Sequence, residues 1–233
     1  MSKIGKLIVN QFFYLLFYMD DLINKRIYLD TTLETPESKL SFIKQIYKPF
    51  KIRLFIVENE DQKETINKLD IKTTITTGTN ILQKHFSIQS LFGGEIKHIN
   101  KLIVIYKFTS EIANNRLMDL IMRHNKEFNI TIIILSCDDH LFKSALKLVD
   151  TLVFDKKTNI QETYNKYFSV YPQMDIFESK LNELTNDKYL LYNKNTTRHV
   201  TCDERFVILD IVNSDANISK SIDMDDIIIH IEI

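Results

Sequence analysis

Residues 101–111 read KLIVIYKFTSE, and the apolar run inside this stretch decides the fold class. The four residues 102–105 are leucine, isoleucine and valine, which is typical of a strand covered on both faces. A second run of the same kind, ITIIIL, follows at 130–135. Between the two runs, apolar residues recur at helical spacing from 111 to 128 and form one stripe. The stretch therefore predicts a β-α-β unit with parallel strands that are adjacent or nearly so.

Helical and strand patterns alternate along the rest of the chain, without a long linker, repeat or low-complexity block. The sequence predicts a single α/β domain over 1–233, with a mostly parallel sheet flanked by helices, a core of about 6–192 and a C-terminal extension at 193–233. We expect helices at 7–22, 37–46, 62–69, 141–148, 160–168 and 175–184, strands at 26–29, 52–57, 151–154 and 189–191, a strand or loop at 72–80, and apolar runs at 206–212 and 227–233.

Composition excludes several classes of protein. With 44% apolar and 26% charged residues and a net charge of -1, the chain is neither a disordered tail nor a basic nucleic-acid clamp. Its four glycines argue against a fold built on glycine-rich ligand loops. Two cysteines, Cys137 and Cys202, are too few for a disulfide framework and indicate a reducing compartment. The apolar run 7–18 is shorter than the roughly 20 residues of a membrane span, and no signal-peptide cleavage site follows it.

The order of segments resembles the genome-packaging ATPases of large DNA viruses, the poxvirus-type branch of the FtsK/HerA P-loop superfamily. In that family a strand ending in two acids is followed by a helix, an aromatic or aliphatic residue with Asn and Ser/Thr, and a strand ending in Leu-Ser-Gln. Here 102–107 (LIVIYK), 128–131 (FNIT) and 132–137 (IIILSC) match that order. Residues 26–41 resemble the family's second strand and its Pro-containing helix start, and 184–192 resemble the segment after the core. The resemblance implies a RecA/FtsK-type, P-loop NTPase-like fold.

The residues that bind nucleotide in this family are replaced in this chain. A P-loop, GxxxxGK[ST], cradles phosphates with backbone N–H groups and places a hydroxyl on magnesium. The candidate here is Gly5-Lys6, which lacks the first glycine and is followed by Leu7 instead of a hydroxyl residue. The resemblance makes Gly5 and Lys6 the cofactor-binding candidates, and it assigns no catalytic or metal-ligating residue.

Three further family positions also depart from the pattern. The metal-binding acids fall on Tyr106 and Lys107, and the γ-phosphate-sensing glutamine falls on Cys137. The family's Arg-His pair falls on Lys126-Glu127, while an Arg-His pair occurs three residues earlier, at 123–124. An alternative interpretation is an ordinary strand end, with Tyr106 in the core and Lys107 in solvent.

These departures predict a divergent viral DNA-packaging ATPase-like protein with a degenerate, non-hydrolysing nucleotide site. No cofactor is expected, and ATP with magnesium would bind only if the site were functional. The resemblance implies double-stranded DNA and capsid or vertex proteins as partners, a ring of like or unlike subunits, no membrane, and a location in host cytoplasm or virion. Two alternatives remain: a viral or plasmid α/β interaction protein that is not an enzyme, and an active packaging ATPase truncated at its N-terminus.

Overall fold

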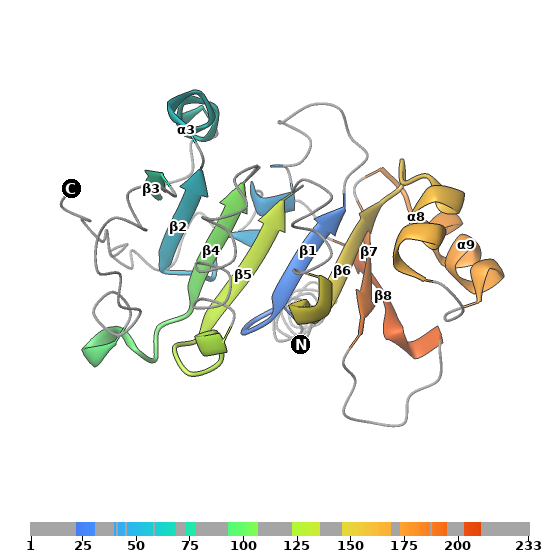
Figure 1. The fold of residues 1–233 in the computed structure, drawn as a ribbon. Helices are drawn as coiled ribbons and strands as arrows, with labels where there is room; N and C mark the ends of the chain where they lie inside the picture. The colour runs from blue at the N-terminus through green and yellow to red at the C-terminus, as the bar shows by residue number, and fades with distance from the viewer. Residues whose placement is uncertain are drawn as a thin grey trace, which may run out of the picture.

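The computed structural model describes a mixed sheet with helices on both faces (Figure 1). It describes residues 22–30, 40, 42–44, 46–57, 59–68, 73–77, 93–106, 123–135, 146–168, 173–186, 188–194 and 203–210. Within these residues the sheet has eight strands in the order β3-β2-β4-β5-β1-β6-β7-β8. The strands are β1 Arg26–Asp30, β2 Ile52–Val57, β3 Thr74–Thr77, β4 Lys101–Tyr106, β5 Ile130–Leu135, β6 Thr151–Asp155, β7 Lys188–Asn193 and β8 Phe206–Asp210.

Every neighbouring pair from β3 to β6 is parallel, and only β7 and β8 join in antiparallel fashion. β4 and β5 lie side by side, with Lys101 opposite Ile130 and Tyr106 opposite Leu135. The predicted parallel neighbours are therefore confirmed, and so is the mostly parallel α/β class. The undecided segment 72–80 contains the edge strand β3.

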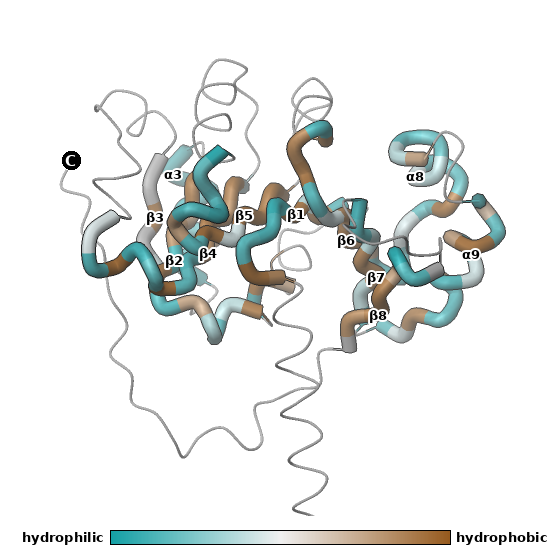
Figure 2. The backbone as a smooth tube through the Cα atoms, turned by 90° about the horizontal axis from the view of Figure 1, so that it is seen from below, coloured by the Kyte–Doolittle hydropathy of each residue, from teal (hydrophilic) through white to brown (hydrophobic). Residues whose placement is uncertain are grey.

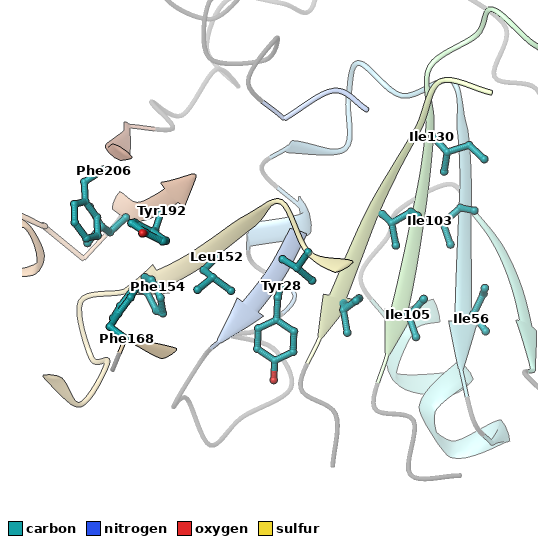
Figure 3. Close-up of a cluster of buried hydrophobic side chains, with 14 of the residues drawn as sticks. Tyr28, Ile56, Ile103, Ile105, Ile130, Leu152, Phe154, Phe168, Tyr192 and Phe206 are labelled. Atoms are coloured by element: carbon teal, nitrogen blue, oxygen red, sulfur yellow. The ribbon is translucent and has the colours of Figure 1, made fainter. Parts of the chain in front are cut away.

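Two hydrophobic clusters cover the two faces of the sheet, because alternate residues of each strand point to opposite sides. The first core cluster contains Tyr28, Ile103, Ile105, Ile132 and Phe154, and it is the cluster drawn in Figure 3. The second core cluster contains Leu29, Val104, Tyr106, Ile133 and Val153. Because each central strand contributes to both clusters, its sequence reads as a continuous apolar run.

Helices divide between these two faces. The helical residues Leu40, Phe42, Ile43 and Ile46, and Ile66 of α3 (Glu60–Asn67), pack in the second core cluster. The first core cluster is covered by α8 (Ile160–Tyr167) and α9 (Met174–Asn182), together with Leu146 and Leu148. Asn59 caps α3 and Asn159 caps α8, since each side chain accepts a hydrogen bond from a backbone N–H three residues on.

Most expected elements coincide with observed ones, shifted by one or two residues at their ends. The short 3-10 helices η1 (Gly94–Ile96) and η2 (Asp203–Arg205) were not predicted. Outside the described residues lie the expected helix at 7–22 except Leu22, most of the helices at 111–128 and 141–148, the start of the helix at 37–46, and the run at 227–233. Within the described part of the chain, no helix has the length and apolar character needed to span a membrane.

Candidate functional site at the carboxyl edge of the sheet

The carboxyl end of β1 is where the direction of winding changes. From β1 the chain passes to β2, on one side, through helical residues that pack in the second core cluster. From β5 it crosses β1 to reach β6, on the other side, through residues that pack in the first core cluster. Ligands of open α/β sheets bind outside the carboxyl ends of strands at such a switch point. The candidate site is therefore the edge formed by the ends of β4, β5, β1 and β6.

The described ends of β4 and β5 at this edge are buried residues, one aromatic and one aliphatic. Tyr106 and Leu135 are each only 1% exposed, and both belong to the second core cluster. The interpretation that placed Tyr106 in the core is confirmed. Carboxylates are the usual protein ligands of magnesium in nucleotide sites, and the described end of β4 has none.

Polar groups gather instead at the ends of β1 and β6. Asp30, the last residue of β1, has its Oδ1 atom 3.9 Å from Nζ of Lys166 on α8. The adjacent Tyr167 is half-buried, and its ring lies 6.2 Å from that of Tyr28. Burial, and then the neighbouring charge of Asp30, raise the pKa of the Tyr167 hydroxyl, which stays protonated. The ion pair between Lys166 and Asp30 thus links α8 to the end of β1, where the connection to β2 begins.

Asp155, the last residue of β6, initiates the turn into α8. Its Oδ1 atom accepts a hydrogen bond from the backbone N–H of Lys157 at 2.8 Å and lies 3.5 Å from the Thr158 hydroxyl. Its Oδ2 atom is buried and has no hydrogen-bond partner among the residues that the structure describes. Burial raises the pKa of this carboxyl group. Across the described residues, no three His, Cys, Asp or Glu side chains form a group that could hold a metal ion.

The family-like motif at 128–131 lies at the opposite, amino edge and has a structural role there. Asn129 adopts a left-handed backbone with φ of 52°, and its side-chain amide donates to the carbonyl of His98. The Thr131 hydroxyl donates to the Leu22 carbonyl at 3.1 Å and accepts from the Asn24 N–H at 2.9 Å. These bonds join the turns that precede β1, β4 and β5, so the motif aligns the starts of these strands.

The candidate Arg-His pair also lies at the amino edge, in the turn before β5. Arg123 and Lys126 are exposed, and Nδ1 of His124 lies 3.1 Å from Oε2 of Glu127. Neither Arg123-His124 nor the family position of the pair, Lys126-Glu127, lies at the carboxyl ends of the strands. Gly5, Lys6, Lys107 and Cys137 lie outside the described residues.

Sequence reasoning did not single out Asp30, Lys166 or Tyr167. Asp30 ends an apolar strand in the same way that Asp155 does, and this repeated pattern was the available signal. The approach of Lys166 to Asp30 joins residues 136 positions apart and depends on where α8 packs. No local pattern in the sequence contains that contact.

Comparisons with known proteins give a fold. No family model and no curated protein match the chain. Among solved structures, the DNA-packaging ATPase B204 from Sulfolobus turreted icosahedral virus matches 80% of this chain and 97% of its own length, with 12% identity and a TM-score of 0.51. The genome packaging NTPase B204 from Sulfolobus turreted icosahedral virus 2, in complex with ATP-gammaS, matches 79% and 95% at 14% identity, with a TM-score of 0.46. The cytoplasmic domain of the Type VII secretion ATPase EccC from Thermomonospora curvata matches 80% and 25% at 10% identity, with a TM-score of 0.41.

At 12% identity, the match with the first of these structures shows the fold alone. The chain therefore has a P-loop NTPase-like α/β fold.

Proposed function

We propose that this chain is a viral DNA-packaging ATPase-like protein whose nucleotide site is degenerate and does not hydrolyse ATP. The observation that carries the proposal is the buried pair Tyr106 and Leu135 at the ends of β4 and β5, beside the switch point of a P-loop-like sheet. A fold like that of a packaging ATPase supports the first half of the proposal. The missing carboxylate at the end of β4 supports the second half.

Phosphoryl transfer depends strongly on the groups that bind the nucleotide and its magnesium ion. Its catalysis consists of positioning and charge neutralisation, with little covalent chemistry that other residues could take over. Without an acid at the family positions, here Tyr106 and Lys107, a bound nucleotide would lack the carboxylate that holds magnesium against its phosphates. In this reading the protein acts as a structural or regulatory subunit of a packaging assembly.

Two sequence segments are candidates for the remnant of the phosphate-binding loop. The first is Gly5-Lys6, implied by the family resemblance. The second is the connection after β1, because a P-loop joins the end of a strand to a helix and β1 ends at the switch point. There, residues 33–40 read LETPESKL, with Lys39 in the register of the P-loop lysine and both glycines replaced. Leu40, which would stand in place of the magnesium-binding hydroxyl, is 0% exposed in the second core cluster.

The proposed partners are double-stranded DNA and capsid or vertex proteins, in a ring of like or unlike subunits in host cytoplasm or the virion. The proposed organisation is one domain over 1–233, with a core of about 6–192 and an extension at 193–233.

ATP binding and hydrolysis by the purified chain test the proposal, with magnesium and with or without duplex DNA. We expect no turnover above a heat-inactivated control. Lys6→Ala and Lys39→Ala variants then show which lysine supports any residual binding. Magnesium-dependent turnover that Lys39→Ala or Lys6→Ala abolishes would refute the degenerate site. Failure to bind either ATP or duplex DNA would favour an interaction protein of another kind.

A further inference from the structure

We infer that the amino edge of the sheet is a docking surface for the phosphate backbone of duplex DNA. This inference rests on the proposed function for its choice of partner, and on the described residues for its location. The edge lies opposite the candidate nucleotide site and is the edge seen from below in Figure 2. The loops that precede the parallel strands meet there, because parallel strands begin at the same edge.

A row of lysines runs along this edge, with at least one described lysine shortly before each of five neighbouring strands. In the order β2, β4, β5, β1 and β6, these residues are Lys51, Lys97, Lys126, Lys25 and Lys147. Lys126 and Lys147 are exposed, and the other three are half-buried. The order of strands in the sheet brings these residues together, although they come from separate parts of the sequence.

The dimensions of the row suit a polyanion. Neighbouring strands lie about 4.8 Å apart, so the row from β2 to β6 extends over about 19 Å. Duplex DNA carries one negative charge per 1.7 Å of helix axis, which amounts to roughly 11 charges along that length. A local row of this kind allows DNA contact in a protein whose net charge is only -1.

Acidic groups at the same loops only partly offset the row. Asp150 is 7% exposed and forms an ion pair with Arg26, with Oδ1 2.6 Å from Nη2. Oε1 of Glu127 lies 3.8 Å from Nζ of Lys97, and its Oε2 is near His124. Glu95 is exposed in η1. These acids leave the described loops before the five strands with a positive balance.

Binding of a labelled 20-base-pair duplex to the full chain, measured by fluorescence anisotropy between 50 and 200 mM salt, tests the inference. The test variant carries Lys51→Gln, Lys126→Gln and Lys147→Gln. The matched control carries Lys156→Gln, Lys157→Gln and Lys188→Gln at the carboxyl edge, which likewise combine two exposed lysines with one half-buried lysine. Both variants change the net charge equally, and urea unfolding checks that both are folded.

Each lysine–phosphate contact adds about 0.9 to the slope of log affinity against log salt concentration. We expect the test variant to bind about tenfold more weakly, with a slope reduced by about 2.7, and the control to match the unaltered chain. Equal binding by both variants would show that DNA does not dock at the amino edge, although DNA would remain a partner, and would overturn the inference. No duplex binding by the unaltered chain would overturn the inference together with the DNA component of the proposed function. Competition by polyglutamate as strong as that by unlabelled duplex would replace DNA with an acidic protein and also overturn the inference.

Discussion

We expect Lys101 to make this protein more stable as the pH rises through the alkaline range. The side chain is 0% exposed, and its Nζ atom donates to the carbonyls of Ile99 at 2.8 Å, Phe128 at 2.7 Å and Lys97 at 3.2 Å. Burial lowers the pKa of this amine from its ordinary 10.5 to about 8. Between these two pH values the unfolded chain holds a proton that the folded chain has released. The free energy of unfolding therefore rises with pH in this window.

The size of the effect follows from the displacement of the pKa, since one pKa unit corresponds to 1.36 kcal/mol. The free energy of unfolding attributable to Lys101 should rise by about 3 kcal/mol between pH 8 and 10.5. Urea unfolding of the unaltered chain and of Lys101→Met across this range measures the rise as a difference, which cancels other titrating groups. Lys126→Met, an exposed lysine in a neighbouring turn, controls for the loss of one positive charge. A Lys101→Met difference that stays constant with pH would refute the reasoning.

Three further substitutions test the packing and the polar links of the fold by urea unfolding. Phe168→Ala should cost about 3–5 kcal/mol, because the ring is 2% exposed and its centroid lies 4.9 Å from that of Tyr192; a cost below 1 kcal/mol would contradict this packing. Asp150→Ala should cost about 2–4 kcal/mol by leaving Arg26 without its paired carboxylate, and a double-mutant cycle with Arg26→Ala should show strong coupling instead of additive costs. Asn159→Ala should cost about 1 kcal/mol through loss of the α8 cap, and an unchanged unfolding midpoint would show that the cap is dispensable.

The central strands could be predicted from the sequence because burial on both faces produces a local apolar pattern. β2, β4 and β5 are buried along their entire length, so each reads as an uninterrupted apolar run. The order in which the strands pair produces no such local pattern in the sequence. β1 lies between β5 and β6, strands that begin more than a hundred residues later in the chain, and no periodicity contains that information.

The candidate site was harder to predict for the same reason. The interpretation that Tyr106 lies in the core needed only the strand pattern, and the structure confirms it. Asp30 and Lys166 meet only after the sheet has formed and α8 has packed on it. The 128–131 motif suggested a family resemblance, yet the described contacts of Asn129 and Thr131 lie with strand starts at the amino edge. A motif can thus report common architecture without marking a reactive site.

The burial of Tyr106 indicates that the proposed loss of hydrolysis cannot be reversed by one substitution at that position. The side chain is 1% exposed among Val104, Leu102 and Leu135, in the layer that also holds the helical residues after β1. An aspartate introduced there would lose the packing of a large ring and bury a carboxylate, which costs several kcal/mol unless it is paired. The new acid would respond with a raised pKa and would bind magnesium poorly at neutral pH. Because the end of β4 is part of the core in this chain, its contribution to stability opposes the introduction of a metal-binding acid at Tyr106.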